Sequence, residues 1–153
     1  ASDVYKRQLR EYQAPVEYGR SEIIRKGKKI AVLGVGSMIP SCMEICKGLK
    51  DDGYDPTFVN ARFVKPLDVD LLDELAKDHS LFVTVEENVK SGGYGEHVSA
   101  YMEACHPEIR VLSAAVWDRF VPQGNVESLR SRIGLGVEDI RQAIEDSEEL
   151  KEQ

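Results

Sequence analysis

Polar side chains stand just after the apolar strands that the sequence predicts, and their types could do chemistry. They are Arg62, Glu86, Glu87, Asp118 and Arg119. Because the carboxyl ends of parallel strands share one edge of a sheet, we expect these groups to lie along the same edge, where sites and interfaces are built. Most of them are expected to form structural salt links, with one cation reaching a phosphate as the alternative.

Glu86 and Glu87 are the first candidates for proton transfer, since they are adjacent carboxylates at the end of an apolar run. Successive side chains of a strand point to opposite faces of the sheet. The two carboxylates therefore cannot form one acid and base pair on a regular strand. We expect them to form a polar strand terminus that orients the following glycine-rich loop or an interface.

The loop after these carboxylates contains three glycines and leads into a predicted helix. Gly92, Gly93 and Gly95 permit a close backbone approach or a positive φ angle. Such a loop suits a contact between two chains or two domains as well as a ligand. His97, on the helix, is the histidine nearest to this edge, and we expect it to pack at a surface or an interface.

Residues 34–37 (Gly-Val-Gly-Ser) lie between a predicted strand and a predicted helix, where a dinucleotide fingerprint would lie. The third glycine of that fingerprint is missing, because its position holds Ile39. The next strand ends in Arg62 rather than in an acid that could hold a ribose. We therefore expect a tight turn from strand to helix, with anion binding by the helix N-terminus as the alternative.

The remaining reactive residue types form no recognisable catalytic or metal-binding set. No Ser-His-Asp set, Cys-His pair, P-loop or metal motif is present, so we assign no catalytic, cofactor-binding or metal-binding residue. Cys42, Cys46 and Cys105 are expected to be small buried core residues in a reducing cytosol, with a metal or redox role as the alternative.

The overall composition excludes several functional classes. A net charge of −7 over 153 residues opposes general nucleic-acid binding, because nothing would offset the repulsion of phosphates. The longest apolar run, residues 30–42, is shorter than a membrane span, and the first 20 residues lack the apolar core of a signal peptide. We therefore expect a cytoplasmic protein without membrane contacts.

Strands and helices alternate along the chain, which predicts an α/β fold. The predicted strands are residues 21–25, 30–35, 57–61, 81–85 and 110–116. The predicted helices are residues 37–49, a segment capped by Asp68, and residues 93–104, 125–133 and 137–150. Right-handed crossovers between such strands give a mostly parallel sheet covered by helices on both faces. We predict a three-layer α/β/α sandwich around a mixed five-stranded sheet, with residues 21–25 as an antiparallel edge strand.

A family resemblance joins these motifs. Residues 60–68 (Asn-Ala-Arg-Phe-Val-Lys-Pro-Leu-Asp) resemble the signature of the C-terminal, transketolase-type domain of 1-deoxy-D-xylulose-5-phosphate synthase. Residues 30–38, 83–95, 117–124 and 134–140 resemble further segments of that domain in the same order. The resemblance implies a domain over residues 15–153. Residues 1–14 would be a tail or linker, and their order stays open.

The resemblance also implies an activity that the chain is not expected to perform alone. The family enzyme condenses pyruvate with glyceraldehyde 3-phosphate and releases carbon dioxide, with thiamine diphosphate and Mg²⁺ as cofactors. Its cofactor ligands and catalytic residues belong to other domains, so none is carried over to this sequence. The expected role is structural, in contact with the other domains of the parent enzyme and within a homodimer.

The candidate residues for that contact are Arg62, Glu86, Glu87, Gly93, His97, Asp118 and Arg119. Two other classes of function stay open. One is a terminal domain or separate subunit of a transketolase or a 2-oxoacid dehydrogenase. The other is a free-standing module that binds a phosphorylated metabolite at residues 34–37.

Overall fold

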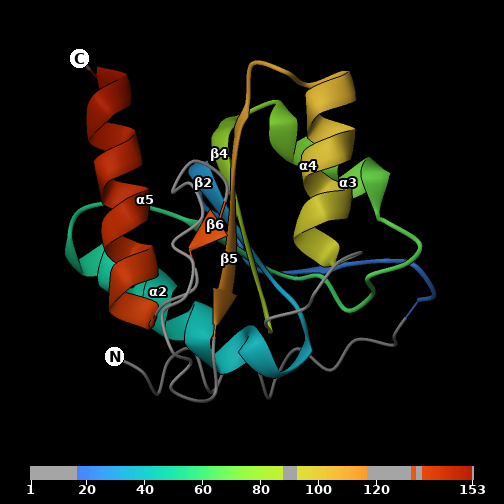
Figure 1. Ribbon diagram of the computed structural model, residues 1–153, viewed down its shortest axis with the longest axis horizontal. Coiled ribbons are helices and arrows are strands. Elements are labelled where there is room, and N and C mark those ends of the chain that lie inside the picture. The colour runs from blue at the N-terminus through green and yellow to red at the C-terminus, as the bar shows by residue number, and fades with distance from the viewer. Residues whose placement is uncertain (1–16, 88–92, 117–131, 134–135, 153) are drawn as a thin grey trace.

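A mixed β-sheet forms the centre of the protein (Figure 1). The computed structural model describes residues 17–87, 93–116, 132–133 and 136–152. The strands are β1 (Glu22–Arg25), β2 (Lys29–Gly34), β3 (Thr57–Asn60), β4 (His79–Glu87), β5 (Arg110–Val116) and β6 (Arg132–Ile133). Their spatial order is β1-β3-β2-β4-β5-β6. Only β1 is antiparallel to its neighbour among the described strands.

The five predicted strands are all present, and the mixed sheet with an antiparallel edge strand is confirmed. The short strand β6 is an addition, which pairs with Ser113 and Ala114 of β5. Its residues, Arg132 and Ile133, fall in a segment that the sequence predicted to be helical. That prediction is wrong for these two residues, whose backbone extends the sheet beyond β5. The rest of the predicted helix lies outside the described residues, as do residues 1–16.

Helices cover both faces of the sheet, as predicted (Figure 1). The helices are α2 (Ile39–Asp51), α3 (Val69–Ala76), α4 (Tyr94–Cys105) and α5 (Val137–Glu152), with the short 3₁₀ helix η1 (Gly36–Met38) before α2. One core cluster joins α2 and α5 to one face, through residues such as Ile45 and Ile144. A second joins α3 and α4 to the other face, through Leu72 and Met102. Among the described residues, no helix is long and apolar enough to cross a bilayer.

The apolar faces of the helices follow the predicted periodicity, with one exception. Cys42 and Cys46 are fully buried on α2, and burial raises the pKa of both thiols. Cys105 was expected in the core but is exposed, because it is the last residue of α4. Asp68 caps α3 as predicted, since its side chain accepts a hydrogen bond from the Leu71 N–H at 3.2 Å.

The turn between β1 and β2 separates the two strands, so they do not form a hairpin. Strand β1 pairs with β3, and β3 lies between β1 and β2. Gly27 makes this possible, since a Cβ atom on it would lie 2.1 Å from the Asp55 carbonyl oxygen. The chain can therefore pass against the start of β3 only where no side chain intervenes.

Candidate functional site

The carboxyl ends of β2 and β4 form the switch point of the sheet. The two strands are neighbours, yet the chain leaves β2 for α2 on one face and leaves β4 for α4 on the other. In open α/β sheets this divergence creates the crevice where ligands or partners bind. The candidate residues of β4 and of the turn after β2 therefore lie at the expected place.

Glu86 holds the first turn of α4. Its Oε1 accepts a hydrogen bond from the Tyr94 N–H at 3.0 Å, and its Oε2 accepts one from the Gly95 N–H at 2.6 Å. These two N–H groups have no partner within the helix, and a negative charge is favoured at a helix N-terminus. The carboxylate thus acts as a side-chain cap for the start of α4.

Gly95 is required by this arrangement. A Cβ atom at this position would lie 2.8 Å from both Glu86 Oε2 and Thr84 Oγ1, and 2.9 Å from Ser113 Oγ. A side chain at residue 95 would therefore displace side-chain oxygens of β4 and β5 that now contact the start of the helix. Tyr94 is 2% exposed, and burial, together with the charges of Asp68 and Glu86, raises the pKa of its hydroxyl.

Glu87 points to the opposite face, as the strand alternation predicts. Its carboxylate accepts a hydrogen bond from the Ser37 hydroxyl of η1, and its side chain is exposed. The bond bridges the ends of β2 and β4 across the switch point. A carboxylate beside residues 34–37 also repels phosphate, so the charge opposes the anion-binding alternative for this turn.

Arg62 pairs with β1, on the outer side of the sheet. Its guanidinium contacts the Glu22 carboxylate, and the two side chains are only 14% and 13% exposed. The backbone of Arg62 has φ = 62°, and the Asn60 side chain accepts the Arg62 N–H at 3.0 Å. Arg62 and Glu86 therefore share the edge as predicted, but each is bonded to a different element.

Gly93 and His97 lie together at the start of α4. The Gly93 carbonyl accepts the His97 N–H at 3.3 Å, and Gly93 is the residue that precedes the helix. The ring of His97 is half-buried, and its Nε2 is buried without a hydrogen-bond partner among the described residues. The predicted candidates Asp118 and Arg119 lie outside the described residues.

Glu22 is a residue of this edge that the sequence analysis missed. It carries the charge opposite Arg62, and its second carboxylate oxygen, Oε1, is buried without a partner among the described residues. Forty positions separate the two residues in the chain. The only feature of the sequence that could have pointed to Glu22 was the prediction that its strand lies at the edge of the sheet.

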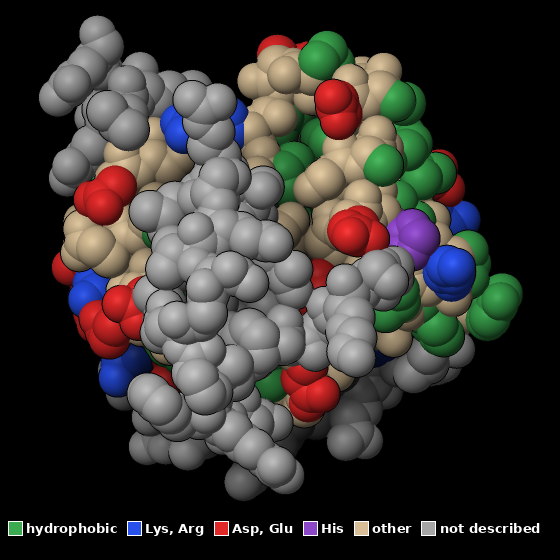
Figure 2. All heavy atoms as spheres, in the orientation of Figure 1, with side chains coloured by type: hydrophobic (Ala, Val, Ile, Leu, Met, Phe, Trp, Pro, Cys, Tyr) green, Lys and Arg blue, Asp and Glu red, His purple; other side chains and the backbone are tan. Residues whose placement is uncertain are grey.

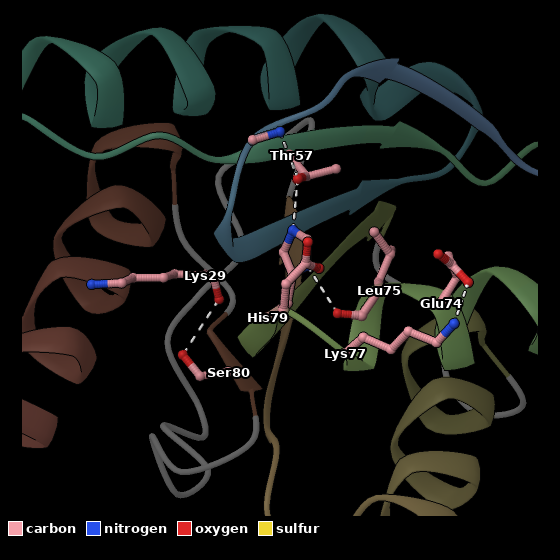
Figure 3. A network of polar contacts seen from close by, with 9 residues as sticks. Lys29, Thr57, Glu74, Leu75, Lys77, His79 and Ser80 are labelled. Carbon is pink, nitrogen blue, oxygen red and sulfur yellow. Dashed lines mark hydrogen bonds and ion pairs between the residues drawn. The ribbon is translucent and has the colours of Figure 1, made fainter.

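A second polar network lies at the opposite, amino edge of the sheet (Figure 3). His79 is fully buried there, with Nε2 at 2.6 Å from Thr57 Oγ1 and Nδ1 at 2.8 Å from the Leu75 carbonyl oxygen. Thr57 Oγ1 also accepts the Gly27 N–H at 2.9 Å. His79 Nδ1 also lies 2.6 Å from Asp78 Oδ1, so the ring has polar partners on both nitrogens. The network ties β3, β4 and the turn after β1 together.

Acidic and basic side chains both appear on the described part of one face of the protein. The face in Figure 2 shows acidic and basic side chains in small separate groups among apolar ones. Among the described residues, no three His, Cys, Asp or Glu side chains come together as ligands for a metal ion. Among the described residues, the carboxyl edge carries carboxylates that accept hydrogen bonds, Glu86 and Glu87, and the ion pair of Arg62 with Glu22.

The fold and this edge define a domain of the transketolase type. Residues 19–140 match the family model described as the C-terminal domain of transketolase, and the chain belongs to that family.

The similar curated proteins include 1-deoxy-D-xylulose-5-phosphate synthases. The enzyme of Lachnoclostridium phytofermentans is 38% identical over 86% of this chain and 21% of its own length. That of Dictyoglomus thermophilum is 39% identical over 89% of this chain and 22% of its own length. The chain thus spans about one fifth of the length of these relatives.

Solved structures show the same fold. A split-gene transketolase, described as an inactive β4 tetramer, matches with a TM-score of 0.70 and 28% identity, over 87% of this chain and 43% of that chain. A 2-oxoglutarate:ferredoxin oxidoreductase from Magnetococcus marinus matches with a TM-score of 0.50 and 12% identity, over 92% of this chain and 21% of that chain. The second likeness concerns the fold alone.

Proposed function

We propose that this chain is the C-terminal domain of a cytoplasmic 1-deoxy-D-xylulose-5-phosphate synthase. The parent enzyme would convert pyruvate and glyceraldehyde 3-phosphate to 1-deoxy-D-xylulose 5-phosphate and carbon dioxide, for isoprenoid, thiamine and pyridoxal synthesis. The observation that carries the proposal is the 38–39% identity to such synthases over most of the described domain. The predicted strand-end motifs at Arg62 and Glu86 support it.

The role of the domain would be to support the assembly. The charged groups of Glu86 and Arg62 form contacts within the domain, with the first turn of α4 and with Glu22 respectively. These contacts fix the shape of the carboxyl edge. Glu87, whose carboxylate accepts the Ser37 hydroxyl, is exposed at the same edge and would face a neighbouring domain or a second copy in a homodimer. Thiamine diphosphate and Mg²⁺ would be bound by other domains of the parent enzyme, of whose relatives this chain spans about one fifth.

The experiment is a comparison of the native full-length protein with this chain alone. The full-length protein is expected to form 1-deoxy-D-xylulose 5-phosphate from the two substrates only when thiamine diphosphate and Mg²⁺ are added. This chain alone is expected to form none. A full-length protein that accepts only ketose donors, as a transketolase would, contradicts the assignment of the substrate.

A second arrangement is favoured by one observation. The solved relative with a TM-score of 0.70 is described as a split-gene transketolase, and this chain covers 43% of it. The domain could likewise belong to a separately encoded subunit of a thiamine-dependent enzyme. The length of the native open reading frame tests this: roughly 450 further residues upstream, from typical domain sizes, indicate one long chain. A short frame beside a thiamine-binding gene indicates the split form.

A further inference from the structure

The segment through which the chain enters the domain is held along its whole length. We call residues 18–22 the entry segment, and residues 60–68 the signature segment. The Tyr18 ring meets the Phe63 ring edge-on, with their centroids 5.6 Å apart. A Cβ atom on Gly19, whose φ is +73°, would lie 2.8 Å from Pro66 Cγ. The first two residues of the entry segment thus contact the signature segment at the protein surface, where Tyr18 is 80% exposed.

The next two residues of the entry segment bond to one carboxylate. Arg20 Nη1 lies 3.4 Å from Asp68 Oδ1 and 2.8 Å from Asp70 Oδ2. The Ser21 N–H donates to Asp68 Oδ2 at 2.8 Å, and the Ser21 hydroxyl donates to the Ala61 carbonyl at 3.1 Å. Glu22, the last residue of the entry segment, forms an ion pair with Arg62. All five successive residues therefore contact the signature segment or the start of α3.

Asp68 couples two elements through its two oxygens. Oδ1 accepts the Leu71 N–H and so starts α3, while Oδ2 accepts the Ser21 N–H. The Asp68 side chain is 8% exposed, so both bonds are largely shielded from water. Any change in the path of the entry segment would break a charge-assisted hydrogen bond at the start of a helix.

Arg62 adds an unusual backbone conformation to this contact. Its φ of 62° lies in the left-handed region, which residues with a side chain enter only at some energetic cost. The Asn60 side chain supports this conformation through the Arg62 N–H. The turn directs the guanidinium toward Glu22, at the end of the entry segment, rather than toward the switch point.

We infer that the signature segment is a clasp that fixes the direction in which the chain enters the domain. Asp68 and Arg62 are then positioning residues: they set how this domain is held against whatever precedes Tyr18. The part of the inference that concerns catalysis rests on the proposed function. The clasp itself rests on the contacts of residues 18–22 alone.

The test is Asp68→Ser, made both in this chain and in the native full-length protein. Serine is an equally good helix cap, so α3 is kept, but its shorter side chain cannot also reach the Ser21 N–H. Amide exchange followed by NMR is expected to be at least about tenfold faster at Ser21 and unchanged at Leu71. In the full-length protein kcat is expected to fall about tenfold with little change in KM, as for a residue that positions a domain rather than binding a substrate.

Asp55→Ser is the matched control. Asp55 pairs with Arg25 at 2.7 Å, at the far end of β1, so this variant removes an ion pair of the same strand without touching the entry segment. In this control, the amide exchange rate at Ser21 and the kcat of the full-length protein are expected to equal those of the wild type.

The outcomes separate the two proposals. Unchanged exchange at Ser21 in Asp68→Ser overturns the clasp, and faster exchange with an unchanged kcat overturns its positioning role. A wild-type protein without synthase activity overturns the proposed function instead. In that case the amide exchange rate at Ser21 still tests whether the clasp exists. X-ray scattering then tests the positioning role: a radius of gyration changed in full-length Asp68→Ser supports it, and an unchanged radius overturns it.

Discussion

Glu86 Oε2 lies 2.6 Å from the Gly95 amide nitrogen, and this hydrogen bond joins the end of β4 to the first turn of α4. Two features of the sequence thereby explain each other. The carboxylate needs unpaired N–H groups, and the glycine lets the helix come close enough to supply them. The edge of the sheet is therefore built for a fixed geometry rather than for proton transfer between two carboxylates.

Gly95→Ala is expected to destabilise the domain by about 2 kcal/mol, the usual cost of overpacking a tight contact. The added Cβ would meet side-chain oxygens of Glu86 and Thr84 at 2.8 Å, so these side chains or the backbone that carries them must shift. Urea unfolding measures the change. Gly136→Ala is the control, because among the described residues its Cβ would meet only Asp139 Oδ2, at 3.7 Å. Equal stability of the two variants would contradict the close approach of α4.

Glu86→Gln and Glu87→Gln form a matched pair of neighbouring substitutions. Glutamine at residue 86 has one oxygen for two N–H donors, and its amide group would face one of them. We expect a loss of about 2 kcal/mol, as for a partly buried donor left without a partner. At residue 87 the side chain is exposed, so the loss should stay within about 0.5 kcal/mol. Equal losses in urea unfolding would show that Glu86 does not cap α4.

Asp73 links α3 to α4 and should respond to acid. His106 Nε2 lies 2.7 Å from Asp73 Oδ1, and the Tyr101 hydroxyl donates to the same oxygen at 2.7 Å. These hydrogen bonds, that of His106 first, lower the pKa of Asp73. A lowered pKa in the folded state means that the contribution to stability is complete above the pKa of the unfolded chain. It is lost as the pH falls through the pKa of the folded state.

Tyr101→Phe tests this link directly. Removal of one hydroxyl donor is expected to raise the pKa of Asp73 toward its ordinary value, as followed by NMR titration of the carboxyl carbon. Tyr18→Phe serves as the control, since Tyr18 packs on Phe63 and not on Asp73. An Asp73 pKa that is the same in wild type and Tyr101→Phe would rule out the hydrogen bond.

Local patterns were sufficient to predict most of the fold. Strands buried on both faces appear in the sequence as apolar runs of β-branched residues, and helices packed on the sheet appear as a helical periodicity of apolar residues. These two patterns were sufficient to predict the positions of β2 to β5 and of the helices between them. Alternation along β4 likewise predicted that Glu86 and Glu87 diverge, which the contacts with Gly95 and Ser37 confirm. Both inferences depend only on neighbours in the chain.

Contacts between residues that are distant in the chain could not be predicted from the sequence. The sequence does not reveal that β1 lies beside β3, because this depends on Gly27 passing close to the Asp55 carbonyl. The ion pair of Arg62 with Glu22 could not be predicted either, because it depends on the position of β1 beside β3. The buried contact of His79 with Thr57 also depends on two strand starts meeting at one edge. In each case a long-range approach decides the local chemistry.

In the proposed function the carboxyl edge of this domain supports the assembly of a larger enzyme, and Glu87→Lys in the native full-length protein tests this role most directly. Glu103→Lys, an equal change of charge at an exposed position of α4, is the control. Sedimentation velocity with a parallel assay of synthase activity should show assembly weakened about tenfold, or about 1.4 kcal/mol, and activity lowered with it, in Glu87→Lys alone. Sedimentation and activity of Glu87→Lys equal to those of the wild type would contradict the claim.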